Sequence, residues 1–155
     1  MKGIFAVLHA RAICHATEDL DKVKSTLENT FGKTEIDVSQ TEGHHGNPII
    51  ILEVVTRDID VIDGFFSRLN DSDIDEILAS LRSRMDDGCN LFIRIDKQAA
   101  FNGDIRLGRS DDVISVRIQV RTFPSKYEIA SSAVREYFED RRPERTQDVT
   151  RTQTL

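Results

Sequence analysis

The sequence predicts an α+β fold: a mostly antiparallel, open-faced sheet with helices packed on one face. Several segments alternate between apolar and polar residues, which is typical of strands with one buried and one free face. Other segments repeat apolar residues at helical spacing, and the two kinds follow one another in the order βαββααββα. The 155 residues suit one domain, which we expect over 1–140, with a polar, flexible tail at 141–155.

The first half of the chain contains three predicted strands and one helix. Residues 4–15 alternate, so they predict the first strand. Apolar residues at helical spacing then predict a helix at about 18–31, which Thr17 would cap. A weaker strand is predicted at 33–41. The β-branched run 49–56 predicts a strand that is well buried.

The second half begins with a helical stretch at 58–87. A polar break divides it into two helices, and Ser72 is the expected cap of the second. Strands are predicted at 89–96 and at 114–121, where the alternation is cleanest. A last helix is expected at 125–139.

Charge is unevenly distributed along the chain. The net charge of −6 argues by itself against nucleic acid as a partner, because binding a polyanion needs Lys and Arg. The stretch 58–87, however, holds nine acidic residues against three arginines, whereas 94–126 holds seven basic residues against four acidic ones. The helices therefore carry the negative charge, and the later strands are basic.

If the strands pair as proposed, their outward side chains share the helix-free face of the sheet. This set comprises Phe5, His9, Arg11, Phe92, Arg94, Arg117, Gln119 and Arg121. Arginine forks hold phosphates and flat rings stack on bases, so such a face is suited to RNA. The alternative is that these are ordinary solvent-facing residues that pair across strands.

Composition narrows the classes of protein. Hydrophobic residues make up 39% of the chain and charged residues 31%, which excludes disorder of the whole chain. Cys14 and Cys89 are too few for a disulfide framework or a cysteine-rich zinc site, so we expect reduced, buried thiols. The sequence contains no apolar run of membrane-spanning length and no signal-peptide pattern. We therefore expect a cytoplasmic protein.

Two strings could carry chemistry. Residues 42–48, Glu-Gly-His-His-Gly-Asn-Pro, place His44, His45 and Asn47 in a glycine-rich turn. The histidines could bind a metal with Glu42, but adjacent residues of an extended chain point in opposite directions. They could equally contact a phosphate or backbone carbonyls, and we expect no metal or cofactor.

The second string is Arg94-Ile95-Asp96-Lys97-Gln98-Ala99-Ala100-Phe101, at the end of a strand. Arg94, Lys97 and Gln98 could grip a phosphate and read a base edge, or they could only form ion pairs and cap a turn. The sequence contains no phosphate loop, nucleophile elbow or spaced carboxylate set, so an enzyme is the less favoured class.

Further motifs stand beside the two strings above: His9-Ala10-Arg11-Ala12, Ala16-Thr17-Glu18-Asp19, Lys22-Val23 and Asp112. With them, the chain resembles, over about residues 5–122, an archaeal RNA-binding family described as a predicted exosome subunit. This resemblance implies an archaeal cytosolic protein with a fold similar to the large-subunit ribosomal protein that binds 5S RNA. It also implies RNA binding and an association with the exosome, and it brings no catalytic residues.

The sequence therefore predicts a non-catalytic RNA-binding protein, an accessory of RNA processing or degradation. The predicted RNA-binding residues are His9, Arg11, His44, His45, Asn47, Phe92, Arg94, Lys97, Gln98, Arg117, Gln119 and Arg121. One alternative is a protein-interaction subunit that docks through the acidic helices at 58–87. The other is a metal- or small-ligand-dependent enzyme that uses His44 and His45.

Overall fold

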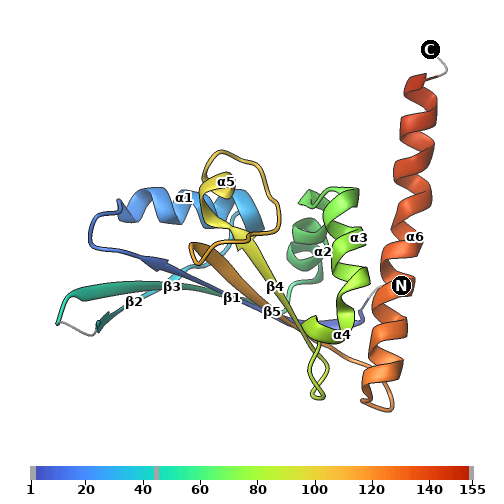
Figure 1. The fold of residues 1–155 in the computed structure, drawn as a ribbon, viewed down its shortest axis with the longest axis horizontal. Coiled ribbons are helices and arrows are strands. Elements are labelled where there is room, and N and C mark those ends of the chain that lie inside the picture. Colours follow the sequence, from blue (N-terminus) through green and yellow to red (C-terminus); the bar gives the residue numbers. More distant parts are fainter. Residues whose placement is uncertain (1–2, 44–45, 154–155) are drawn as a thin grey trace.

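The computed structural model describes residues 3–43 and 46–153 and consists of one antiparallel sheet with helices on one face (Figure 1). The strands are β1 (Phe5–Cys14), β2 (Asp37–Glu42), β3 (Pro48–Thr56), β4 (Asn90–Asp96) and β5 (Val113–Val120). The helices are α1 (Leu20–Phe31), α2 (Ile59–Arg68), α3 (Asp71–Ala79), α4 (Leu81–Arg84), α5 (Lys97–Phe101) and α6 (Tyr127–Gln153).

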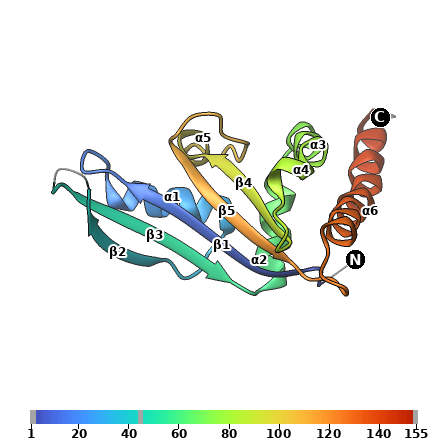
Figure 2. The ribbon, with the colours of Figure 1, turned by 60° about the horizontal axis from the view of Figure 1, so that its bottom comes forward.

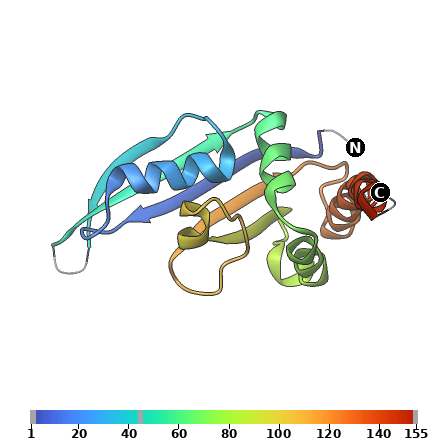
Figure 3. The ribbon, with the colours of Figure 1, turned by 90° about the horizontal axis from the view of Figure 1, so that it is seen from above.

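The strands lie side by side in the order β2-β3-β1-β5-β4, and every neighbouring pair is antiparallel. Figure 2 shows the sheet in front of the helices, and Figure 3 shows α1 and α2 lying across its other side. The predicted fold class is confirmed. The second predicted helix of the stretch 58–87 is divided at Ser80 into α3 and α4. The helix α5 was not predicted, because five residues are too short to show a helical period.

The core lies between the sheet and the helices. The inward side chains of β1, Leu8, Ala10, Ala12 and Cys14, are all buried, and small alanines let a helix approach the sheet closely. Cys14 and Cys89 are buried free thiols, as predicted. Among the described residues, no helix is both long and apolar enough to cross a membrane.

An aromatic cluster fastens α6 to the rest of the domain. The ring of Phe66 on α2 lies 4.9 Å from that of Phe5 on β1 and 5.1 Å from that of Phe138 on α6. Tyr137 of α6 also lies 4.9 Å from Phe5, edge to face, and its hydroxyl donates a 2.5 Å hydrogen bond to Asp63. These contacts hold the first part of α6 beside α2 and the start of β1.

Phe5 corrects the predicted helix-free face. Its side chain is 6% exposed and faces the core, although strict alternation placed it outward with His9. The register of the β1–β5 pair shifts between Phe5 and Val7, so the alternation is interrupted there. The ring is therefore unavailable to a ligand on the open face.

The structure also corrects β3. The β-branched run was expected to be well buried, but only Leu52 and Val54 are fully buried, and Val55 is 55% exposed. This strand has one face on the core and one on the open side, where Ile51 is half-buried. Density in β-branched residues indicates a strand, but it does not say how many of its faces are covered.

The helix boundaries differ from the predictions at their caps. Asp19 rather than Thr17 caps α1, accepting a hydrogen bond from the backbone of Asp21, and Asn70 rather than Ser72 caps α3. The helix α6 continues to Gln153, well beyond the predicted end at 139. The predicted tail contains no repeat of apolar residues, so periodicity gave no sign of this helical extension.

Candidate nucleic-acid interface

The helix-free side of the sheet, here called the open face, carries rows of paired side chains, three of which cross both β1 and β5. In antiparallel strands directly opposed residues point to the same side, so the register defines each row. The first row is Asn90, Gln119 and Val7; the second is Phe92, Arg117, His9 and Val55; the third is Arg94, Ser115, Arg11, Glu53 and Asp37. Neighbouring rows are about 7 Å apart along each strand.

The part of these rows on β4, β5 and β1, which we call the basic half, contains three arginines and no acid. Arg11, Arg94 and Arg117 are all exposed. Adjacent strands are about 4.8 Å apart, so the three guanidinium groups share a small area. The acids of these three rows, Glu53 and Asp37, lie on the other half, on β3 and β2.

A chain of hydrogen bonds crosses the sheet from β5 to β3. The Nη2 of Arg117 lies 3.1 Å from Nδ1 of His9, and the Nε2 of His9 lies 2.6 Å from Glu53 Oε2. Arginine can only donate, so Nδ1 of His9 accepts the hydrogen bond from Arg117. The N–H at Nε2 then donates the hydrogen bond to Glu53. His9 therefore bridges Arg117 and the Glu53 carboxylate, accepting a hydrogen bond from the one and donating one to the other.

The structure brings together six of the twelve predicted residues in the basic half of the open face. These are His9, Arg11, Phe92, Arg94, Arg117 and Gln119. Arg121 is exposed and follows β5 directly. Asn47 lies apart from them in the β2–β3 turn, where its carbonyl accepts a hydrogen bond from Gly43 N. His44 and His45 lie outside the described residues.

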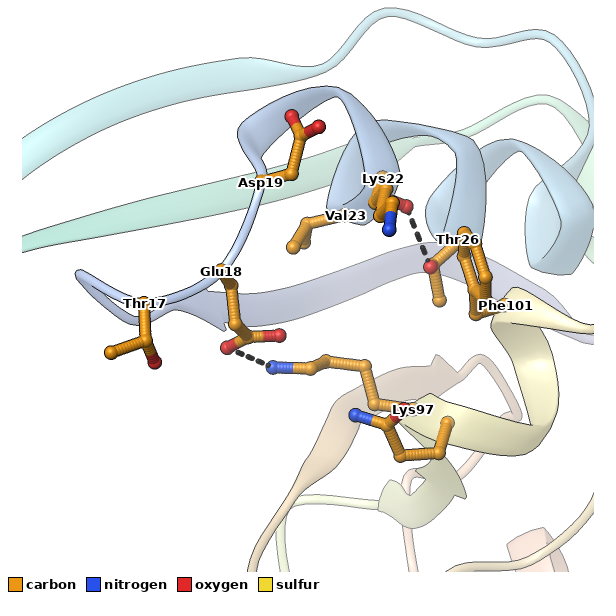
Figure 4. Close-up of a pocket in the computed structure, with 9 residues that line it drawn as sticks. Thr17, Glu18, Asp19, Lys22, Val23, Thr26, Lys97 and Phe101 are labelled. Atoms are coloured by element: carbon orange, nitrogen blue, oxygen red, sulfur yellow. Dashed lines mark hydrogen bonds and ion pairs between the residues drawn. The ribbon is translucent and has the colours of Figure 1, made fainter.

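Lys97 corrects the prediction that it would grip a phosphate. It belongs to α5 rather than to a loop, and it is only 3% exposed. Its ammonium group donates to the Ile13 carbonyl at 2.8 Å and lies 2.9 Å from Glu18 Oε1 and 2.7 Å from Asp112 Oδ1. Figure 4 shows Lys97 reaching from α5 toward Glu18, which precedes α1. The side chain therefore fastens three segments together.

The neighbour Gln98 also lies away from the basic half. Its Nε2 donates a hydrogen bond to Asp112 Oδ2 at 3.0 Å. Gln98 therefore supports the ion-pair cluster that Lys97 forms with Glu18 and Asp112. Gln98 and Lys97 border a cavity of about 320 Å3 that also touches Lys22 and Phe101, on the helix side of the sheet (Figure 4).

The pKa values of the cluster show which interactions dominate. Burial lowers the pKa of Lys97, but its hydrogen bonds to Asp112 and Glu18 outweigh burial, and the pKa lies above its ordinary value. Burial raises the pKa of Asp112, but hydrogen bonds from Gln98 and Lys97 outweigh it and leave the pKa below the ordinary range. The lysine is therefore charged and paired.

His15, Glu18 and Asp112 are the one group of described residues whose ligand atoms, all within 4.8 Å of one another, could hold a metal. The ammonium group of Lys97 lies against both carboxylates. The position between them therefore already holds a cation, and a metal ion would have to displace it. This cluster joins three strings that carry the family resemblance, at Glu18, Lys97 and Asp112.

Several residues of the open face were not predicted. Glu53 and Val55 were missed because β3 was expected to be well buried. The alternation of β5 places Ser115 outward with Arg117, but a serine on a strand carries no distinctive signal of a site. Alternation within residues 49–56 could have placed Glu53 outward. The pairing of Arg11 with Glu53 could not be read from one chain without the register.

Fold and face together define an open-faced α+β domain with an arginine-bearing sheet surface. Residues 8–120 match the family described as RNA binding, and the chain belongs to this family. The chain is 34% identical over 142 residues to the RNA-binding protein PAB1135 of Pyrococcus abyssi, covering 85% of this chain and 92% of that protein.

Two solved structures extend the likeness to the fold. Protein AF2318 of Archaeoglobus fulgidus, of the DUF54 family, superposes with a TM-score of 0.76 at 36% identity, covering 85% of this chain and 98% of that one. Mth689, a DUF54 protein of Methanothermobacter thermautotrophicus, gives 0.74 at 28% identity, covering 86% and 98%. The fold is thus shared along almost the whole of each relative.

Proposed function

We propose that the protein binds RNA, without catalysing a reaction on it, through the basic half of the open face. The observation that carries the proposal is the convergence of Arg11, Arg94 and Arg117 in two neighbouring rows of the basic half, which contain no acid on β4, β5 and β1. The family description and the name of the Pyrococcus relative support RNA as the nucleic acid.

The distribution of charge explains how an acidic protein can bind a polyanion. The net charge is −6, but the acids are concentrated on the helical stretch at 58–87, and the helices cover the opposite side of the sheet. Each phosphate neutralised by an arginine releases condensed counterions, which favours binding locally whatever the total charge. Repulsion by the distant acids is screened over roughly 8–10 Å at physiological salt.

The proposal is tested by fluorescence anisotropy with labelled oligoribonucleotides and the matching DNA, at low and at moderate salt. We expect binding to RNA that weakens as salt is added, because counterion release depends on the salt concentration. The absence of binding at low salt, or binding that is independent of salt, would overturn the proposal.

Variants locate the interface. We expect the triple variant R11Q/R94Q/R117Q to lose binding about 10-fold or more at moderate salt, because three phosphate contacts disappear. The control R82Q/R106Q/R135Q removes the same charge from exposed arginines on α4, the loop before β5 and α6. Equal losses in the two triple variants would mean that net charge, and not this face, determines binding.

The finer role, as an accessory of the exosome, extends the proposal and rests on the family resemblance. Capture of exosome subunits by the tagged protein from an archaeal extract, lost on RNase treatment, would indicate a link through RNA. The competing hypothesis, docking through the helices at 58–87, expects capture that resists RNase and fails when Asp73, Asp75 and Glu76 are reversed in charge. Glu76 already pairs with Arg84 and Arg109, so part of that acidity is neutralised within the protein.

A further inference from the structure

A hollow of about 340 Å3 lies in the basic half of the open face. Its floor includes Ser115, which stands between Arg94 and Arg11 in one row of the sheet. Serine is much shorter than arginine, so this row is low at its centre and high at both ends. Phe92 and Arg117, neighbours in the next row, also line the hollow.

The aromatic wall of this hollow is available to a ligand. Phe92 is 42% exposed, although large apolar side chains on strands usually face the core. Among the described residues, the contacts between aromatic rings all lie on the helix side of the sheet, and none of them involves Phe92. A flat apolar ring can therefore stack on Phe92.

The rim of the hollow selects for negative charge. Arg94 keeps a side-chain exposure of 56%, and its contacts to the Ser110 carbonyl, at 3.4 Å, and to Asp111, at 4.0 Å, are long. Arg117 donates one hydrogen bond to His9, and a guanidinium group has five N–H donors. An occupant that suits both wall and rim has a planar ring and carries anionic oxygens close to it.

We propose that this hollow takes one unpaired nucleobase of single-stranded RNA, stacked on Phe92, with flanking phosphates on Arg94 and Arg117. This inference rests on the proposed function and adds the form of RNA recognised. Pockets for small ligands span about 300–1,000 Å3, so a hollow at the lower limit suits a single base. Paired bases are stacked inside a duplex and cannot enter, whereas unpaired bases splay out onto aromatic side chains.

The test compares a single-stranded oligo-uridylate with the same strand annealed to its complement, by fluorescence anisotropy. We expect the single strand to bind more tightly, and F92A and F92L to weaken it about 5- to 150-fold, since both lose the ring. F92W should keep or improve binding. The control F101A removes a ring that is equally exposed, at 40%, but lies on α5, and should leave binding unchanged.

A direct signal of stacking comes from one 2-aminopurine placed in the oligo-uridylate. Its fluorescence should be quenched on binding to the wild-type protein and to F92W, but not on binding to F92A at saturating concentration. Equal affinity for single strand and duplex, with F92A no weaker than F101A and quenching unchanged, would overturn the nucleobase hollow. If R11Q/R94Q/R117Q still weakened binding in that case, the proposed function would stand; if that variant also had no effect, both proposals would fail.

Discussion

Arg117 on β5 donates a hydrogen bond to the imidazole of His9 on β1, at 3.1 Å across the open face. The ring N–H of His9 in turn donates a hydrogen bond to Glu53 on β3, so the carboxylate is paired with the ring and not with the guanidinium group. Since an arginine that pairs directly with a carboxylate is neutralised, the intervening imidazole leaves the charge of Arg117 available to a phosphate.

Replacing Arg117 with Gln should weaken RNA binding and reduce its dependence on salt. The loss of one phosphate contact should make the slope of log K against log salt less steep by about 0.7 to 1. Anisotropy titrations over a series of salt concentrations measure this slope. The matched variant R82Q, on α4, should leave the slope as it is; an unchanged slope in R117Q would remove Arg117 from the interface.

Replacing Glu53 with Gln should increase affinity for RNA. The amide keeps an acceptor for His9 but removes an anion that lies beside Arg11 in the same row of the sheet, so repulsion of phosphates falls. We expect a gain of about 2- to 5-fold at low salt, which shrinks as salt screens the charge. A loss of affinity in E53Q would instead indicate that the carboxylate itself contacts the RNA.

Lys97 should stabilise the fold without contributing to RNA affinity. K97M leaves Glu18 and Asp112 close together without their cation, and we expect the free energy of unfolding to fall by about 1–3 kcal/mol. The effect is smaller than for a fully buried pair because both carboxylates are partly exposed. Urea unfolding measures the change, and K126M, which replaces an exposed lysine, serves as the control.

Affinity for RNA should be the same in K97M and in the wild-type protein once the fraction folded is accounted for. A folded K97M protein that had lost RNA binding would show instead that the ion-pair cluster belongs to the interface, as the sequence analysis predicted for Lys97.

Stability should decline in acid partly through Asp112. The pKa of Asp112 in the folded protein lies below the ordinary value. The contribution of its carboxylate to the free energy of unfolding is therefore fully present above the unfolded pKa of about 3.9, and it is lost as the pH falls through the lower pKa of the folded protein. The wild-type protein should therefore exceed D112N in unfolding free energy at neutral pH, and the difference should shrink below about pH 4.

Urea unfolding of both proteins from neutral pH down to about pH 3 measures this difference. D111N changes a neighbouring carboxylate that is fully exposed and should show no such narrowing. A difference between wild type and D112N that stayed constant over the whole range would mean that the carboxylate charge is not what stabilises the cluster.

Much of the open face could be predicted because strand alternation is a local property. The inward set Leu91, Ile93 and Ile95 fixes Phe92 and Arg94 on the opposite side of β4, whatever the strand pairs with. The same rule failed at Phe5, where a change of register within the β1–β5 pair turned the ring into the core.

The sequence by itself determined the five strands and most of the longer helices, and that arginines lie on the outward side of β1, β4 and β5, because these depend on spacing between near neighbours. Only the tertiary structure decided that Ser115 lies between Arg94 and Arg11, and that Lys97 is buried against Glu18 and Asp112. Those relationships depend on strand order, register and the packing of α5, which bring together residues 15 to 104 positions apart in the chain. No local pattern contains them, since they are fixed by the packing of the whole core.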